Sequence, residues 1–489
     1  MRLLRASVLT MLVSVLAPAQ QASDQYTISP FWLGGAADPR VLEAVPGNRV
    51  FVGCGDGTIR ILTDADNNGI AEAAALFVSS VWGPHGLAWK QNGPGYDLFV
   101  AHLTAPGGGT GQITLFTDLN GDDIFDVVTT MVMNLPLGAH QVNNIKLDPS
   151  QQWLYIAQGA TSNSTAGGGA CVAKIPVTAQ NLVWGTPQIQ IVATGLRNPW
   201  GIEFLPNGTL FATDNGRDDL GPSDPPDEFN HIVQGGDYGF PAVSGMPPAG
   251  NTTRAPIGLF ESHSSACGFA IDKGNLLTGF VHQVFVAEWG NWNGLAPTPR
   301  GQKIVQGNLH QRSNGTWVLN SWDFLANCGH VLDVDVGPTG ALFFSVQWGG
   351  PGWLEGVYHV VPTHGTALKM SGLPELGQTI QVSVHSPSRP GHLYKVAASM
   401  GTGPIPTALG NLGLTWDDIF VWSLSGNIYL NFAPTGILNA QGIGAGADSV
   451  LIPNLPVLSG FTLYLAAATF DPVTIALTSV TPTAHLLML

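Results

Sequence analysis

Short apolar segments of one kind recur six times along the chain: VFVG at 50–53, LFVA at 98–101, LYIA at 154–157, LFAT at 210–213, VFVA at 284–287 and LFFS at 342–345. Successive segments are 48, 56, 56, 74 and 58 residues apart. Most of them follow a loop rich in Pro, Gly or Asn, as in FLPNGTLFAT, and another apolar strand precedes that loop. A unit of strand, turn and strand that repeats about every 50 residues is typical of a β-propeller blade.

Two adjacent units match position by position over a longer stretch. GTIRILTDADNNGIAEAAALF begins at Gly57, and GQITLFTDLNGDDIFDVVTTM begins 54 residues later at Gly111. Each unit has room for four strands and contains no long amphipathic helix, and radial closure of such units removes exposed sheet edges. We therefore predict an all-β fold with a six-bladed β-propeller over residues 26–362, in which the long fourth interval holds an inserted loop at 247–256. An array of β-sandwiches is the alternative, but it does not require one strand signature in every unit.

The character of the sequence changes after the sixth unit. Charged residues become rare between 369 and 489, and alternating segments such as QTIQVSV and FTLYLAAATF follow one another with Pro and Gly between them. This pattern predicts a separate C-terminal β-sandwich module over 369–489. The segment is similar to the β-modules appended to many secreted bacterial proteins, which implies attachment, sorting or binding.

The composition favours an ordered, turn-rich protein. The chain has 62 glycines and 35 prolines, and 44% of its residues are hydrophobic but only 10% are charged. Disordered chains carry more charge and fewer apolar residues. The formal net charge of -15 gives no sequence-independent attraction to phosphate backbones, so we predict no nucleic-acid partner.

The N-terminal segment MRLLRASVLTMLVSVLAPAQ has the features of a secretory signal peptide over residues 1–19. Arg2 and Arg5 precede an apolar run at 6–16, and Ala17-Pro18-Ala19 supplies the small residues of a cleavage site. The run is shorter than the roughly 20 residues of a membrane-spanning helix, and no later segment reaches that length without interruption. We therefore predict a secreted or periplasmic protein without a membrane span.

Four cysteines are widely spaced, at Cys54, Cys171, Cys267 and Cys328. The lack of a close pair excludes a C-x-x-C-H haem site and argues against a zinc knuckle. In an oxidising compartment these residues form one or two disulfides or stay as buried free thiols, and the sequence does not choose between the two alternatives.

The densest polar segment runs from Gly195 to Pro241 and reads GLRNPWGIEFLPNGTLFATDNGRDDLGPSDPPDEFNHIVQGGDYGFP. Within it, Arg197-Asn198 precede one predicted strand and the acidic run 214–218 follows the next. Loops that lead to the axis of a propeller carry function, so both groups are expected to meet at one place. Arg197 suits a bidentate contact with a carboxylate or a quinone oxygen, and Gly216 leaves its carbonyl free to face a cation. The alternative is that Arg197 only braces the turn by bonding to Asp214 or Asp218.

This segment resembles the soluble quinoprotein glucose/sorbosone dehydrogenase family, in particular its sorbosone-like branch. That family consists of six-bladed propellers that oxidise sugars with pyrroloquinoline quinone. The matching residues are Gly195 to Pro199, Asn215 to Asp218, Leu220-Gly221, Pro226 to Glu228 and Gly235 to Pro241. The resemblance extends more loosely over about residues 30 to 362, through Gly138 to His140, Leu154-Tyr155, Gly159, Thr161 to Asn163, Gly290 to Asn293 and Gly340 to Leu342.

The resemblance implies roles for single residues. His140 matches the general base that removes the proton of the anomeric hydroxyl while hydride passes to the quinone, and imidazole suits this task because its ordinary pKa is about 6.5. Arg197 matches the residue that bonds the quinone oxygens and stabilises developing negative charge, and Asn198 matches a further cofactor contact. The main-chain carbonyls of Gly216 and Arg217 match those that hold a calcium ion against the cofactor.

The last two blades depart from the family pattern. The resemblance implies cofactor contacts from Trp292 and His330, but His330 stands where an arginine is usual, and Gly294 stands where another is common. The acidic partner that orients the catalytic histidine of glucose-type members has no clear match near 159–161. Fewer basic residues are therefore available for the cofactor carboxylates.

The duplicated acidic hairpins suggest two further calcium sites. Oxygen-bearing side chains stand at positions 1, 3, 5 and 9 of each loop, the spacing by which a calcium loop wraps its ion. They are Asp64, Asp66, Asn68 and Glu72 in the first hairpin and Asp118, Asn120, Asp122 and Asp126 in the second. Both loops lack a glutamate at position 12, which predicts modest affinity. Solvated Asp/Asn turns are the alternative.

The leading hypothesis is an exported quinone-dependent dehydrogenase that oxidises a sugar or sugar aldehyde and passes electrons to an external acceptor. The alternative is a non-catalytic secreted propeller that binds glycans or proteins through the same mouth. His85 and His263 lie in loops expected either to line this mouth or to pack as structural histidines. Hydrolysis by a propeller lactonase requires several side chains around a central calcium, and the sequence offers no dedicated set beyond the acidic residues already assigned.

Overall fold

The chain is nearly all β, which confirms the predicted fold class. The computed structural model describes residues 25–34, 37–272, 274, 276–291, 300–433, 435–444 and 448–489. The predicted signal peptide lies outside these residues. Within them, no helix has the length and apolar character needed to cross a bilayer.

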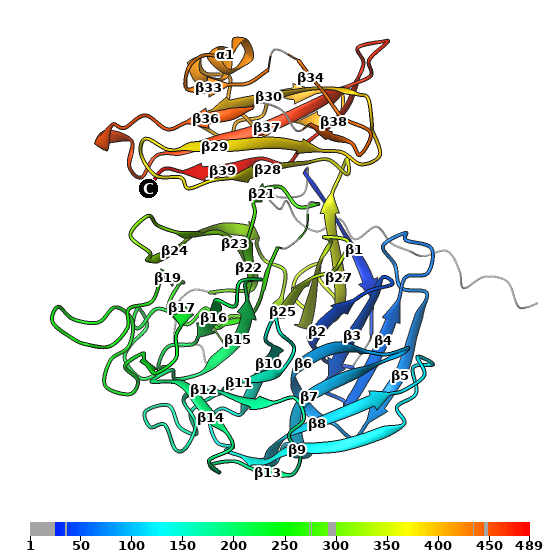
Figure 1. Ribbon diagram of the computed structural model, residues 1–489, viewed down its shortest axis with the longest axis vertical. Coiled ribbons are helices and arrows are strands. Elements are labelled where there is room, and N and C mark those ends of the chain that lie inside the picture. The colour runs from blue at the N-terminus through cyan, green and yellow to red at the C-terminus, as the bar shows by residue number, and fades with distance from the viewer. Residues whose placement is uncertain are drawn as a thin grey trace, which may run out of the picture.

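Six sheets, called blades 1 to 6 here in chain order, form the larger part of the structure (Figure 1). Each has four antiparallel strands, and blades 2 and 3 each add a short parallel strand. Blade 1 contains β2 (Pro39–Val45), β3 (Arg49–Cys54), β4 (Thr58–Thr63) and β5 (Ala73–Ser79). Blade 2 contains β6 (Trp82–Asn92), β7 (Gly95–Ala105), β8 (Gly108–Asp118), β9 (Val127–Leu135) and the added β13 (Leu182–Val183). Blade 3 contains β10 (Val142–Leu147), β11 (Trp153–Gln158), β12 (Cys171–Pro176), β14 (Gln190–Thr194) and the added β18 (Gly236–Asp237).

The remaining blades follow the same plan. Blade 4 contains β15 (Pro199–Phe204), β16 (Leu210–Asp214), β17 (Glu228–Ile232) and β19 (Gly258–Leu259). Blade 5 contains β20 (Ala266–Ile271), β22 (Gln283–Glu288), β23 (Lys303–Gln311) and β24 (Trp317–Leu325). Blade 6 contains β25 (His330–Val336), β26 (Leu342–Trp348), β27 (Gly356–Pro362) and, as its outermost strand, β1 (Tyr26–Trp32) from the other end of the chain.

The first strands of the blades form a closed ring. β2, β6, β10, β15, β20 and β25 each contact the next in this order, and β25 contacts β2 again. Five of these six strands contribute a side chain to one buried cluster, through Val41, Leu87, Trp200, Cys267 and Leu332. The inner strands of the blades are therefore packed together at the centre of the ring.

The six repeated apolar segments all lie in the second strand of a blade, namely β3, β7, β11, β16, β22 and β26. This strand is hydrogen-bonded on both edges and both of its faces lie against neighbouring blades. Nearly every residue of the segments is consequently buried, which explains why they read as continuous apolar runs instead of alternating ones.

The C-terminal module consists of two sheets and one short helix (Figure 1). One sheet contains β28 (Ala367–Ser371), β29 (Thr379–His385), β33 (Leu430–Asn431), β35 (Ile443–Gly444) and β36 (Ser449–Leu451). The other contains β30 (Leu393–Ser399), β34 (Gly436–Ile437), β37 (Thr462–Phe470), β38 (Leu477–Val480) and β39 (Ala484–Leu487). The small pair β31 (Pro406–Thr407) and β32 (Gly410–Asn411), helix α1 (Asp418–Ser425) and a 3₁₀ turn (Pro456–Leu458) complete it.

The direction of the strands defines two ends of the propeller. Because neighbouring strands run antiparallel, the loops that lead into first strands and the loops that join second to third strands lie at one end, which we call the mouth. The hairpins between first and second strands and between third and fourth strands lie at the other end, the base.

The C-terminal module packs against the base hairpin and the outer strands of blade 5 (Figure 1). The two-residue strand β21 (Gly279–Phe280), from the hairpin between the first two strands of blade 5, pairs in parallel with β28. Lys369 of β28 forms an ion pair with Asp272, with 2.8 Å between Nζ and Oδ2. The rings of Trp322 and His485 stack with centroids 4.3 Å apart. None of these three contacts involves His140, Arg197 or Asn198.

The four cysteines are all buried and free. Burial raises the pKa of Cys54 and of Cys171 to about 12, so these thiols stay protonated and unreactive at neutral pH. Of the two alternatives left open by the sequence, the structure has the free thiols.

Candidate functional site

Most of the predicted catalytic and cofactor-binding residues lie at the mouth of the propeller. His140 lies in the loop that leads into β10, and Arg197 and Asn198 lie in the loop that leads into β15. Gly216 and Arg217 follow β16 in a loop between second and third strands, and His330 is the first residue of β25. Trp292 falls outside the described residues.

The Arg197-Asn198 turn is built by a carboxylate at the end of the neighbouring strand. Asp214, the last residue of β16, accepts the Arg197 N–H at Oδ2 (3.0 Å) and the Asn198 N–H at Oδ1 (2.6 Å). Burial, and then the charge of Glu228, raise the pKa of Asp214 well above its usual range. The backbone of the turn is thereby fixed from blade 4, and both side chains are free to be placed by other contacts.

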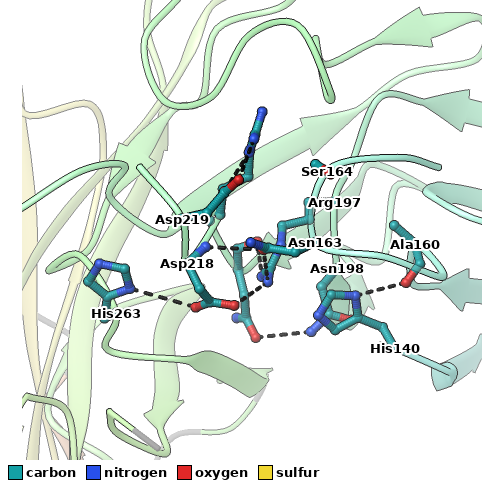
Figure 2. Close-up of polar contacts among 12 residues, drawn as sticks. His140, Ala160, Asn163, Ser164, Arg197, Asn198, Asp218, Asp219 and His263 are labelled. Atoms are coloured by element: carbon teal, nitrogen blue, oxygen red, sulfur yellow. Dashed lines mark hydrogen bonds and ion pairs between the residues drawn. The ribbon is translucent and has the colours of Figure 1, made fainter. Parts of the chain in front are cut away.

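The guanidinium of Arg197 is held between the loops of blades 3 and 4 (Figure 2). Its Nη2 donates to Asp218 Oδ2 at 2.5 Å and to Asn163 Oδ1 at 2.7 Å, and its Nη1 donates to the Asn215 carbonyl at 3.2 Å. The pairing with Asp218 is the bracing contact that the sequence left open as an alternative. Nε is buried and finds no hydrogen-bond partner in the described part of the chain. Arg197 is therefore anchored but keeps one unused buried donor.

His140 is oriented by a backbone carbonyl instead of a carboxylate. Its Nδ1 lies 2.8 Å from the carbonyl oxygen of Ala160 (Figure 2). A carbonyl only accepts, so the neutral ring carries its proton on Nδ1 and keeps a lone pair on Nε2. Burial, and then the Arg197 charge, lower the pKa of His140 to about 4. The imidazole is consequently neutral at neutral pH, which is the form that accepts a proton.

A cavity of about 160 Å³ adjoins His140, and its lining includes His85, Asn143, Asn198 and Trp200. Asn143 donates to Asn198 Oδ1 at 2.8 Å, and Asn198 donates to Asn215 Oδ1 at 3.1 Å. These asparagines link the inner strands of blades 3 and 4 around the cavity.

A glycine makes this close arrangement of side chains possible. A Cβ on Gly159 would lie 2.5 Å from His140 Cβ and 2.6 Å from Asn198 Oδ1. Only a residue without a side chain fits behind both groups. This steric limit explains why position 159, one of the residues that match the family, is a glycine.

Arg40 of blade 1 and His85 of blade 2 also lie at the mouth. His85 Nδ1 lies 2.7 Å from Gln141 Nε2, and His85 Nε2 lies 3.4 Å from Arg40 Nη1. Burial, and then the Arg40 charge, lower the pKa of His85 to about 3. Arg40 is paired with Asp38, with 2.6 Å between Nη2 and Oδ2. Sequence reasoning missed Arg40 and Asn143, because nothing in their local sequence marks them. It included Asn163 in the stretch that matches the family but gave it no role.

The loop after β16 has the features expected of a main-chain cation site. The Gly216 N–H donates to Asp227 Oδ1 at 2.8 Å, and Asp227 Oδ2 also accepts the Ala266 N–H at 3.0 Å. Among the residues described, none donates a hydrogen bond to the carbonyl oxygen of Gly216 or of Arg217. The Arg217 side chain pairs instead with Asp219 near the surface, at 2.7 Å. Both carbonyls are thus available to a ligand.

His330 packs in an aromatic cluster on the opposite side of the mouth. Its ring centroid lies 4.4 Å from that of Trp289 and 5.6 Å from that of Trp348, and its Nδ1 lies 3.0 Å from the Trp289 carbonyl. Burial lowers the pKa of His330. The side chain therefore does not supply the positive charge of the arginine that is usual at this position.

The acidic hairpins lie at the base of the propeller, because each joins the third and fourth strands of its blade. In the first hairpin, carboxylate oxygens of Asp64, Asp66 and Glu72 lie within 4.8 Å of one another. Asn68 lies on the same turn and donates its N–H to Asp64 Oδ1 at 3.1 Å. Asp118, Asn120, Asp122 and Asp126 repeat the turn in blade 2, but no comparable cluster of three carboxylates is found there among the residues described. These eight residues are remote from His140.

Comparison with known proteins identifies the family of the chain. A family model described as "Glucose / Sorbosone dehydrogenase" matches residues 37–350. An uncharacterized protein of Borreliella burgdorferi is 30% identical over 183 residues, which cover 34% of this chain and 45% of that protein. Quinoprotein glucose dehydrogenase B of Acinetobacter calcoaceticus is 47% identical over 55 residues, 11% of this chain and 10% of that protein. The chain thus spans less than half the length of these curated relatives.

Solved structures share the propeller. The holo form of the pyranose dehydrogenase PQQ domain from Coprinopsis cinerea superposes with a TM-score of 0.58 at 14% identity, covering 70% of this chain and 97% of that one. A calcium structure of a Trichoderma reesei enzyme of carbohydrate-active family AA12 gives 0.57 at 18% identity, covering 72% and 99%. At these identities the likeness concerns the fold.

Proposed function

Because the chain belongs to the glucose/sorbosone dehydrogenase family, we propose that it is an exported quinoprotein that oxidises a sugar or sugar aldehyde by hydride transfer to pyrroloquinoline quinone, with His140 as general base. The observation that carries this proposal is the neutral His140, whose Nε2 lone pair stands at the mouth beside the Arg197-Asn198 turn.

The residues at the mouth fit the cofactor. The buried Nε of Arg197 lacks an acceptor within the described chain, and a quinone or carboxylate oxygen would supply one. Asn198 would give a further contact, and Trp292 and His330 would complete the holding set. The free carbonyls of Gly216 and Arg217 would bind calcium beside it, since Ca²⁺ prefers oxygen ligands. When bound, the quinone supplies the two-electron acceptor.

Residues of the chain accept the proton and stabilise the charge that develops during the reaction. The substrate loses its hydroxyl proton to His140 Nε2 as its C–H bond delivers a hydride, so a hydroxyl carbon becomes a carbonyl carbon. Arg197 stabilises the negative charge that develops on oxygen, an electrostatic contribution of a few kcal/mol when the donor is preorganised. The same Arg197 charge disfavours protonated His140, which promotes release of the proton to water after each turnover.

A non-catalytic propeller that binds glycans or proteins remains the second candidate. The observation that favours it is the state of the cations: Arg197 is paired with Asp218, and Arg40 is paired with Asp38. Neutral His330 adds no charge. Among the residues that the structure describes, few unpaired cations are left at the mouth for the carboxylates of the quinone.

Two measurements decide between the candidates. The purified mature protein is titrated with pyrroloquinoline quinone and calcium, and its dye reduction is then measured with aldoses, ketoses and aldosones. The proposal expects stoichiometric uptake and sugar-dependent reduction. Tight sugar or protein binding without uptake at micromolar quinone would select the binding propeller.

The pH dependence of kcat/KM reports the pKa of the base in the free enzyme. With the pKa of His140 lowered to about 4, the active neutral form prevails above that pH and is lost as the pH falls through it. We expect kcat/KM to show no inflection near 6.5 and to decrease only toward pH 4. The measurement is a profile from pH 3.5 to 8, with circular dichroism at each pH to show that the fold persists. An inflection between 6 and 7 would contradict a buried His140 as the base.

The Asp64 hairpin is proposed to bind calcium as a structural staple. A ligand that binds only the folded state stabilises it by RT ln(1 + [L]/Kd), about 2.7 kcal/mol at a hundredfold excess over Kd. We expect calcium to raise the Tm of the quinone-free protein, and Asp66→Asn to reduce this gain. Asp471→Asn is the matched control, because the Asp471 side chain, like that of Asp66, accepts backbone N–H groups in an exposed turn, but it lies in none of the acidic clusters found among the described residues. An equal gain in wild type and Asp66→Asn would leave the hairpin as a solvated turn.

A further inference from the structure

A cavity lies where the C-terminal module meets the outer strands of blade 5, and we call it the junction cavity. Its volume is about 300 Å³, at the lower end of the range of small-molecule sites. The propeller contributes Gln306 of β23 and Trp322 of β24 to its lining, and the module contributes Thr402 and His485. The lining shares no residue with the cavity beside His140. Clefts between domains are common places for ligands, and this one is separate from the mouth.

Gln306 is the clearest sign of a ligand in the junction cavity. The residue is only 6% exposed, and it belongs to the lining. Both hydrogens of its amide are directed to protein acceptors, since Nε2 lies 2.5 Å from Gln283 Oε1 and 3.3 Å from the Thr278 carbonyl. Within the described chain no donor reaches Gln306 Oε1. A buried carbonyl oxygen without a donor is costly, and a donor group of a molecule bound in the cavity would satisfy it.

Two further polar side chains of the lining have unused hydrogen-bonding capacity. Gln25 Nε2 donates one hydrogen to Thr483 Oγ1 at 3.0 Å, and its other hydrogen meets no acceptor among the described residues. Burial lowers the pKa of His485 to about 4, so its ring is neutral at neutral pH and offers one donor and one acceptor. The cavity therefore presents both donors and acceptors. Hydroxyl groups, which donate and accept, match this combination.

Aromatic rings form the apolar part of the wall. The Trp322 and His485 rings stack with an interplanar angle of 19°. Tyr26 and Phe324, which also line the cavity, pack edge to face with centroids 5.0 Å apart. Because each ring is held by a partner, the wall is a rigid apolar surface. Such a surface suits the C–H face of a saturated ring.

The charges of the junction cavity balance. Asp323 is the only Asp, Glu, Lys or Arg among the described residues that line it. Its Oδ1 lies 2.8 Å from Lys303 Nζ, which offsets its charge. His485 is neutral at neutral pH. A charged ligand would thus lose its hydration without gaining an unpaired opposite charge, and a neutral ligand is favoured.

We propose that the junction cavity binds a neutral, polyhydroxylated ring of monosaccharide size between the propeller and the C-terminal module. The volume suits one ring instead of a chain. Such a ligand contacts both parts of the chain and stabilises the docked position of the module. The site goes beyond the proposed oxidation, because its residues take no part in that reaction.

The test is calorimetric titration of the full-length, quinone-free protein with glucose, galactose, N-acetylglucosamine and myo-inositol. We expect saturable binding of at least one of them with a Kd below about 1 mM. Thr402 is exposed at the cavity, and Thr402→Trp is expected to weaken this binding more than about 10-fold by filling the space. Thr379→Trp is the matched control, because Thr379 is an exposed residue of β29 outside the lining. It is expected to leave the Kd unchanged.

A second variant tests the unused acceptor. Gln306→Met keeps a similar volume but removes Oε1, and it is expected to raise the Kd about 3- to 10-fold, the effect of one neutral hydrogen bond. Thermal unfolding shows whether this variant keeps the fold, since it also loses the hydrogen bonds to Gln283 and Thr278. If it does not fold, Thr402→Trp alone decides the question, because it replaces an exposed side chain.

Charged analogues test the chemical class of the ligand. Glucosamine and glucuronate carry a positive and a negative charge on the same ring, and both are expected to bind at least about threefold more weakly than glucose. Tighter binding of either would overturn a neutral ligand. Absence of saturable binding by all of the neutral probes, or binding that Thr402→Trp leaves unchanged, would overturn the site. Selective binding of one sugar would support a sugar site, and equal binding of myo-inositol would support a general polyol site.

Discussion

Replacement of His140 by alanine is expected to lower kcat/KM for the sugar about 10²- to 10⁴-fold, the usual contribution of a positioned general base. The reason is geometric as well as electronic. The Ala160 carbonyl fixes the proton on Nδ1, and burial keeps the ring neutral with its lone pair on Nε2. The variant is measured by dye reduction under saturating quinone and calcium.

Two readouts make this result specific. Quinone uptake by His140→Ala is expected to match wild type, because the holding contacts come from Arg197, Asn198 and the Gly216 loop. His385→Ala in the C-terminal module, a part-buried histidine of β29, serves as the matched control and is expected to keep full activity. Retained activity in His140→Ala would transfer the role of base to another group at the mouth, with His85 as the first to examine.

Replacement of Lys369 by methionine is expected to reduce the free energy of unfolding by about 3–5 kcal/mol, the loss typical of a buried ion pair that loses one partner. The side chains of Lys369 and Asp272 are only 3% and 0% exposed. Lys369 Nζ also donates to the Leu277 carbonyl at 2.8 Å. Methionine fills a similar volume, but it leaves the Asp272 carboxylate buried without its cation. Urea unfolding followed by tryptophan fluorescence gives the free energy.

The matched control is a pair that is more exposed. Arg60 and Asp56 lie 3.3 Å apart with side chains 27% and 31% exposed, so Arg60→Met is expected to change stability by less than about 1 kcal/mol. The double variant Lys369→Met/Asp272→Asn is expected to recover part of the loss, since it removes the unpaired buried charge. A loss below about 1 kcal/mol in Lys369→Met would show that water reaches Asp272 and that the module does not seal this contact.

The architecture was predictable because one packing environment repeats. The second strand of each blade is enclosed on all sides, so selection for buried residues leaves the same apolar run six times. The loop residues of the mouth were predictable only where the proposed contact with the cofactor is made by a side chain, as with Arg197 and Asn198. The resemblance supplied His140, whereas its orientation by Ala160 depends on a backbone oxygen that every residue possesses.

Other features leave no local trace in the sequence. Arg40, His85 and Gln141 come from three blades and meet only after the ring closes. The docking of the C-terminal module through β21 involves a strand of two residues, which is too short to show any periodicity. Such contacts depend on how the blades are placed in space, whereas patterns in the amino-acid sequence describe only the structure within one blade.

The pairing of β1 with β27 closes the propeller through residues from distant parts of the chain. The hydroxyls of Thr27 and Thr363 lie 3.4 Å apart although 336 residues separate them in sequence. Contacts of such high contact order form late, because the entropy of a very large loop must be lost first. Until β1 arrives, β27 presents an unpaired edge to other molecules. We therefore expect ring closure to be a slow step of folding, and intermolecular strand exchange to compete with it at high protein concentration.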